Sequence, residues 1–278
     1  MEKMNKSIKF FGIIALIGVF FACSDGGTNQ VNNQGNNHTH IFASDFLVEP
    51  TCTSAGLTLQ TCSSCSVTWQ LYPTMALGHD HGTSGTGSLV CKRIGCTHQY
   101  AVGETGPAGG IIFYVNTEGF LVEGYSGIIG TFAAYIAYYL EAAPVNQGEG
   151  SWVSVNGVWS FSTGTAIGTG RANTNKILTI DQNSPAALLC KGYIGGGKND
   201  WFLPSKDELD EMYNMKTTLG ISFESFLSSS LYNGSNVWVQ NFSDDRHEFW
   251  YSLYNDRGQG FVLIHIFSGG HIRAIRAF

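Results

Sequence analysis

Cysteine and histidine gather in one short stretch of the chain, and this clustering limits what the stretch can fold into. Residues 38–102 contain five of the seven cysteines and five of the eight histidines. A module of about 30 residues buries too little apolar surface to be stable without a metal ion or disulfide bonds. We therefore predict that 38–102 forms small β modules held together through cysteine and histidine side chains.

The first half of this segment carries a specific pattern. The run PTCTSAGLTLQTCSSCS resembles a short repeat of spirochaete and clostridial surface proteins, in which a histidine precedes a TCT-x-x-G turn and a TC-x-x-C pair. The residues at these positions are His40, Cys52, Cys62 and Cys65. The second half resembles a degenerate copy, with Cys91, Cys96 and His98.

Three states of these side chains are compatible with the sequence. Thiolate and imidazole groups at this spacing bind structural zinc, so His40, Cys52, Cys62 and Cys65 are candidate ligands, with Cys62-x-x-Cys65 as the tight corner. In an oxidising compartment the same thiols pair as disulfides. The cysteines could also stay reduced and bind nothing. All three alternatives are structural, and none implies catalysis.

The N-terminus has the pattern of an export signal. Three lysines within the first nine residues precede an uncharged apolar run at 10–22, which has the length of a signal-peptide core. This run is too short to span a membrane, since a spanning helix needs about 20 apolar residues. We therefore predict a signal peptide at residues 1–22 and export of the remaining chain.

The end of the apolar run predicts how the exported chain is held. Ala22-Cys23 resembles a bacterial lipobox of the permissive spirochaete type, which implies cleavage before Cys23 and lipidation of its thiol. An ordinary secretory signal is the alternative. Residues 23–37 are rich in Gly, Asn and Gln and predict a flexible tether. We expect a lipid-anchored protein of the cell envelope, at the outer membrane or cell surface.

The charge of the chain excludes one class of partner. Its formal net charge is −6, and residues 1–22 carry three lysines and one glutamate, so the mature chain is near −8. Binding to nucleic-acid phosphates requires clustered Lys and Arg. We therefore expect no nucleic-acid partner, and we expect a membrane contact only through the N-terminal lipid.

Residues 103–278 have the length of a single domain and alternate strand and helix patterns. The predicted strands are 111–115, 133–143, 201–203, 237–242, 247–254, 260–267 and 272–278, with a hairpin turning at Asn156-Gly157. The predicted helices are 174–183, 184–190 and the helix that follows Ser205. Ser184 is expected to cap the second helix, and Cys190 to face the core.

The clearest local pattern is Ser205-Lys-Asp-Glu208 after Trp201-Phe-Leu-Pro204. It predicts a capping box, in which Ser205 binds a free backbone N–H at the helix start and Glu208 binds back to the cap. Further acidic residues at 207, 210 and 211 suit the positive end of a helix. We expect this acidic helix start to face water and to have a structural role.

Three motifs together resemble the C-terminal domain of Legionella collagen-like protein. They are GKNDWFLPSKDEL at 197–209, SSSLYNGSNVWVQNF at 228–242 and IRAIRAF at 272–278, and the opening GETGPAGGIIFYV resembles the start of spirochaete versions. The resemblance covers nearly all of 103–278. It implies an α+β, C-type-lectin-like fold related to the core of formylglycine-generating enzyme, following the small Cys/His-stapled β module.

The resemblance implies adhesion or recognition of a glycan or a host or surface protein. Residues 103–278 contain 10 Lys and Arg against 16 Asp and Glu, so a sulfated polyanion is a poor ligand unless the arginines cluster in space. The arginines that could cluster are Arg246, Arg257, Arg273 and Arg276. A structural envelope lipoprotein without a small ligand is the alternative function.

We predict that the chain is not an enzyme. The oxidase relative needs a pair of reactive cysteines for copper, whereas Cys190 is the only cysteine in 103–278. The sequence contains no G-x-S-x-G elbow and no H-E-x-x-H motif. An enzyme related to formylglycine-generating enzyme is the remote alternative.

Candidate ligand-binding residues lie in the second half of the predicted strand 247–254 and at the start of the loop that follows it. They are Trp250, Tyr251, Tyr254, Asn255, Asp256 and Arg257. Aromatic rings stack on sugars while neighbouring amides and charges form hydrogen bonds, and loops of this kind carry function. Calcium is a second possible cofactor beside zinc, because Asp244-Asp245 and Asn255-Asp256 offer oxygen ligands.

Overall fold

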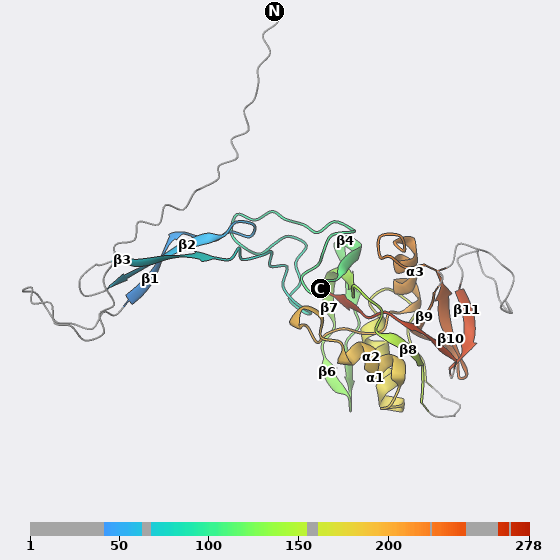
Figure 1. Cartoon of the computed structure of the whole chain (residues 1–278). Helices are drawn as coiled ribbons and strands as arrows, with labels where there is room; N and C mark the ends of the chain where they lie inside the picture. The colour runs from blue at the N-terminus through green and yellow to red at the C-terminus, as the bar shows by residue number, and fades with distance from the viewer. Residues whose placement is uncertain (1–41, 63–67, 155–160, 223, 243–260, 267) are drawn as a thin grey trace, which may run out of the picture.

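The computed structural model describes residues 42–62, 68–154, 161–222, 224–242, 261–266 and 268–278. Strands dominate these residues, and three short α-helices accompany them (Figure 1). The mixed α+β composition predicted from the sequence is therefore confirmed. Among the described residues, no helix has the length and hydropathy needed to cross a membrane.

The N-terminal strands are β1 (Phe42–Val48), β2 (Gly56–Cys62) and β3 (Thr68–Thr74). The later strands are β4 (Ile111–Val122), β5 (Tyr125–Gly127), β6 (Gly130–Phe132), β7 (Tyr135–Ala142), β8 (Gly148–Ser151), β9 (Ser225–Asn233), β10 (Asn236–Asn241), β11 (Phe261–His265), β12 (Gly269–Ile272) and β13 (Ile275–Ala277). The helices are α1 (Gly170–Ile180), α2 (Pro185–Gly192) and α3 (Lys206–Asn214), with a 3-10 turn, η1, at Gly195–Gly197.

The strands form two separate regions. Strands β1, β2 and β3 make an antiparallel sheet of their own, which projects away from the remaining elements (Figure 1). In the larger region a five-stranded sheet has the order β11-β10-β9-β12-β8, and a three-stranded sheet has the order β13-β7-β4. Strands β5 and β6 pair with each other. We call the first region the arm, and the second region the C-terminal domain.

The core of the C-terminal domain is built from both sheets and all three helices. One buried cluster joins Trp152 and Trp201 to Val237 of β10 and to the apolar side of α2. A second cluster joins Phe113 of β4 to Phe226 of β9 and to the buried face of α3. Cys190 is fully buried in the first cluster, as predicted from its place on the helix.

The helix starts predicted at Ser184 and Ser205 are confirmed, whereas the helix predicted at 174–183 begins four residues earlier, as α1 at Gly170. The Ser184 side chain accepts a hydrogen bond from the backbone of Ala187, with Pro185 in the first turn. At α3 both halves of the capping box are present: Ser205 binds the Glu208 backbone, and the Glu208 carboxylate binds back to Ser205. The prediction that this acidic turn faces water is wrong for Glu208, which is fully buried. Its carboxylate also accepts a hydrogen bond from the Gly168 backbone, and this second partner places it inside the protein.

Two of the four arginines proposed to cluster on the surface are buried. The Arg276 guanidinium donates to Asp200 and to Glu141, and its side chain has no exposed surface. Arg273 is 4% exposed and donates to Asn146. Both guanidinium groups have internal partners, so neither is presented on the surface to an external polyanion. Arg246 and Arg257 lie outside the described residues.

Strand β9 was not predicted, because its middle consists of three serines. Ser228, Ser229 and Ser230 are all fully buried. Ser228 Oγ donates to the Trp238 carbonyl, and Ser230 Oγ donates to the Gly164 carbonyl, so each hydroxyl keeps a partner inside the protein. The predicted hairpin turn at 156–157 and the predicted strand at 247–254 lie outside the described residues.

Candidate metal centre

Four side chains that can ligate a metal ion converge where the arm meets the C-terminal domain. They are Cys52, His79, Cys91 and Cys96, and one ligand atom from each lies within 4.8 Å of the others. Cys52 Sγ is 3.7 Å from Cys91 Sγ, and His79 Nδ1 is 3.3 Å from Cys96 Sγ. Cys91 is buried, and the other three residues are partly buried. This Cys3His cluster could hold a metal ion.

The turn between β1 and β2 positions Cys52. The Thr51 hydroxyl accepts a hydrogen bond from the Ser54 backbone at 2.9 Å, and the Thr51 N–H donates to the Ser54 carbonyl. The Gly78 N–H donates to the Cys52 carbonyl at 3.1 Å, so the turn is attached to the segment that leaves β3. Because the next residue in that segment is His79, the first two ligands are brought together by the closing of the arm.

A tight loop positions the other two cysteines. The Cys91 N–H donates to the His98 carbonyl, and the Cys96 N–H donates to the Arg93 carbonyl. Gly95 has a φ of 76°, a left-handed conformation that glycine adopts without strain and that turns the chain back toward Cys91. The Asp80 N–H donates to Cys91 Sγ at 3.3 Å, which favours a thiolate at that sulfur.

The two thiols at the centre of the cluster differ in their tendency to ionise. Burial raises the pKa of Cys91, but hydrogen bonds from the backbone of Arg93 and Asp80 outweigh it and bring the pKa to about 6. Burial raises the pKa of Cys52 to about 12, and its hydrogen bonds with the Cys96 and Cys91 thiols act in the same direction. A first thiolate at Cys91 therefore makes ionisation of Cys52 unfavourable until a cation compensates for both charges.

A layer of histidines packs behind the cluster. The ring of His79 stacks on the ring of His98, with centroids 3.7 Å apart. His98 Nδ1 lies 3.0 Å from His81 Nε2, and His81 Nδ1 lies 3.1 Å from the Ser88 carbonyl. Because a carbonyl only accepts, His81 Nδ1 carries the hydrogen, and neutral His81 then accepts from His98. Burial lowers the pKa of both His81 and His98. These two histidines support the site instead of belonging to the cluster.

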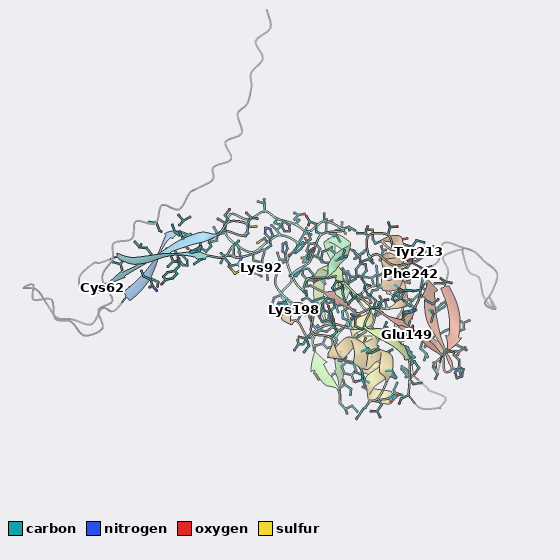
Figure 2. All side chains as sticks on the ribbon, viewed as in Figure 1. Cys62, Lys92, Glu149, Lys198, Tyr213 and Phe242 are labelled. Atoms are coloured by element: carbon teal, nitrogen blue, oxygen red, sulfur yellow. The ribbon has the colours of Figure 1, made fainter. Side chains whose placement is uncertain are left out.

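The structure brings together a different set of residues from the predicted ligands. Of the predicted four, only Cys52 belongs to the cluster, and His40 and Cys65 lie outside the described residues. Cys62 is the last residue of β2, whose first residue, Gly56, lies nearer to Cys52 in the chain. At roughly 3.3 Å per residue, the strand separates Cys62 from Gly56 by about 20 Å. Figure 2 shows Cys62 at the far end of the arm and Lys92, the neighbour of Cys91, at the junction.

The remaining predicted site residues are not placed by the structure. Cys23, the aromatic and polar residues at 250–257, and the acidic residues proposed for calcium all lie outside the described residues. The cluster residues that were not selected, His79, Cys91 and Cys96, belong to the second half of the Cys/His segment. A usable signal was that the second half has only two cysteines, so a site with three cysteines there needs a thiol from the first half and is shared between the two apparent repeats.

Comparison of the chain with protein-family models, with curated proteins and with solved structures gave no match. The protein is therefore described by its own fold and by the Cys3His cluster. The described residues form a mixed α+β protein, mostly sheet, with a Cys3His cluster that could hold a metal ion at the base of a projecting β arm.

Proposed function

We propose that the chain is a lipid-anchored protein of the cell envelope, in which a structural zinc ion holds the Cys/His segment and the C-terminal domain binds a glycan or a surface protein. The observation that carries the zinc assignment is the convergence of Cys52, His79, Cys91 and Cys96 within 4.8 Å. Export, the anchor and ligand binding rest on the sequence patterns at 1–37 and 103–278.

The donor set favours zinc over the alternatives. Three thiolates and one imidazole are a common ligand set of structural zinc, and four protein ligands leave no open position for catalysis. A disulfide between Cys52 and Cys91 would account for two of the residues, but it would not require His79 and Cys96 to converge on them. Calcium prefers oxygen ligands, so it does not suit this cluster.

The charged groups buried in the C-terminal domain have internal partners. Glu141 accepts hydrogen bonds from the Ala108 and Gly110 backbone and pairs with Arg276. Asp200 pairs with the same arginine, and its pKa is lowered by the Arg276 hydrogen bonds and charge, which outweigh the effect of burial. These groups hold loops and the last strand in place, so their burial has a structural explanation.

Metal analysis with thiol counting tests the zinc assignment. The full chain, purified without chelator, should contain one equivalent of zinc, and thiol reagents should react with the cluster cysteines only after the metal is removed. Cys91→Ser should lose the metal. Cys62→Ser is the matched control, because this thiol lies outside the cluster, and it should keep the metal. A metal-free wild-type protein, with its cluster thiols free or paired as a disulfide, would refute the assignment.

A glycan array, run in parallel with pull-down of envelope and host surface proteins, tests the binding role. We expect saturable binding to a restricted group of uncharged or weakly charged glycans, or to a defined protein. Absence of any saturable ligand in both screens would favour the structural lipoprotein instead.

A further inference from the structure

The metal centre lies at a joint, and its ligands come from the two sides of that joint. Cys52 belongs to the turn between β1 and β2, which is part of the arm. His79, Cys91 and Cys96 belong to the segment that follows the arm and packs against the C-terminal domain. We infer that the metal ion locks the direction of the arm relative to the C-terminal domain, and that loss of the ion turns the joint into a hinge. This inference rests on the proposed zinc site.

The segment on the far side of the joint is firmly attached to the C-terminal domain. Tyr139 of β7 donates its hydroxyl to the Leu89 carbonyl and accepts a hydrogen bond from the Tyr100 backbone. The Ser84 hydroxyl is bonded to Asp200, the partner of buried Arg276. His81 is 1% exposed, and its ring packs edge-on against Tyr139 with centroids 5.6 Å apart. Three of the four ligands therefore move with the C-terminal domain.

Within the described part of the chain, hydrogen bonds of two kinds attach the base of the arm. The Leu77 and Gly78 N–H groups donate to the Thr51 and Cys52 carbonyls, which closes the arm on itself. Across the joint, the Arg93 side chain donates to the Gly78 and Leu77 carbonyls, at 3.0 and 3.2 Å, from an exposed setting. Hydrogen bonds in such an exposed setting contribute little to stability, whereas a bound structural zinc ion stabilises the residues that hold it far more strongly.

The position of the arm means that a fixed joint would set the orientation of the C-terminal domain. The sheet of β1, β2 and β3 projects outward and carries exposed Phe46, Leu47 and Val48 along its first strand. It also lies between the predicted membrane tether and the C-terminal domain. A fixed joint would hold that domain at a set orientation from the membrane, while a hinge would let it sample many orientations. Metal loading would thus change how the domain is presented, without altering its fold.

The test measures the distance distribution between two spin-labelled, non-cysteine residues in the full chain. Leu47 on the arm and Ile194 on the C-terminal domain are both exposed, at 60% and 67%, and are suitable for genetically encoded labels. The zinc-loaded protein should give one narrow distribution. Removal of the metal under reducing conditions should replace it with a broad distribution, and Cys52→Ser should do the same in the presence of zinc.

Cys62→Ser is the matched control, since it removes a thiol from the same sheet and should keep the narrow distribution. Circular dichroism of the chelated protein should retain the signal of the folded C-terminal domain. A distribution that stays narrow after zinc has been shown to bind and then to be removed would overturn the lock while leaving the zinc site intact. A chain that never binds zinc would instead overturn the proposed function, and the lock with it.

Discussion

At the scale of single residues, Glu208 connects two helix starts through one carboxylate. Its Oε2 accepts the Ser205 N–H at 2.7 Å, and its Oε1 accepts the Gly168 N–H at 2.8 Å, just before α1. Gly170 lies so close that a Cβ there would collide with Oε2, so the glycine is required by the carboxylate. The side chain therefore organises α1 and α3 together, and its charge state matters to the whole domain.

Burial raises the pKa of Glu208 from an ordinary 4.5 to about 7, although hydrogen bonds from the Ser205 and Gly168 backbone favour the ionised form. In the unfolded chain the same group ionises near its ordinary pKa. Between these two values the folded state holds a proton that the unfolded state has released. The stabilising contribution is therefore complete below the unfolded pKa and is lost as pH rises toward 7.

We predict that this group lowers the free energy of unfolding by up to roughly 3 kcal/mol as pH rises from about 4.5 to about 7. Denaturant titrations at several pH values measure it, and Glu208→Gln should flatten that part of the profile. Asp207→Asn, which changes a partly exposed acid in the same turn, should leave the profile unchanged. An unaltered slope in Glu208→Gln would show that another group is responsible.

At the scale of elements, helix α3 depends on its cap. Ser205 Oγ accepts from the Glu208 N–H at 3.3 Å and donates to the Ala166 carbonyl at 3.0 Å. Ser205→Ala should therefore cost about 0.5–2 kcal/mol, and lower the melting temperature by about 2–4 °C per kcal/mol at this size. Thermal melts measure the shift, with exposed Thr217→Ala as the control. Zinc content should not change, and a variant that melts like wild type would contradict the assigned role.

The elements that the sequence predicted well are those that depend on neighbouring residues. The cap at Ser205 needs only Glu208 three positions later, and Pro185 marks a helix start by its own geometry. Strand β9 needs distant partners, because its buried serines are acceptable only next to the Trp238 and Gly164 carbonyls. Arg276 likewise became an internal residue through Asp200 and Glu141, which are distant in sequence.

The contrast between neighbouring and distant residues also explains which part of the candidate site was predicted from the sequence. Spacing within 38–102 indicated a Cys/His staple, but it could not show which residues share one. Cys62-x-x-Cys65 has the more familiar spacing, yet β2 carries Cys62 away from Cys52. Which residues share the cluster depends on one long-range contact, the closing of the arm at Gly78, together with the local left-handed turn at Gly95.

At the scale of the whole molecule, the predicted order is lipid, tether, arm, metal joint and C-terminal domain. Cys23→Ala should prevent lipidation and move the protein from the detergent phase to the aqueous phase in phase-partition experiments. Cys190→Ala, which removes a thiol from the core, is the control and should partition as the wild type does. Unchanged partitioning of Cys23→Ala would indicate an ordinary secretory signal.

The metal joint is the central claim of this account, and X-ray absorption at the zinc edge of the purified full chain tests it most directly. A Cys3His site predicts four-coordinate zinc with three sulfur neighbours at about 2.3 Å and one nitrogen neighbour at about 2.0–2.1 Å. Cys91→Ser should remove this signature, and Cys62→Ser should preserve it. A shell made only of oxygen and nitrogen, or a protein without zinc whose Cys52 and Cys91 are joined as a disulfide, would contradict the account.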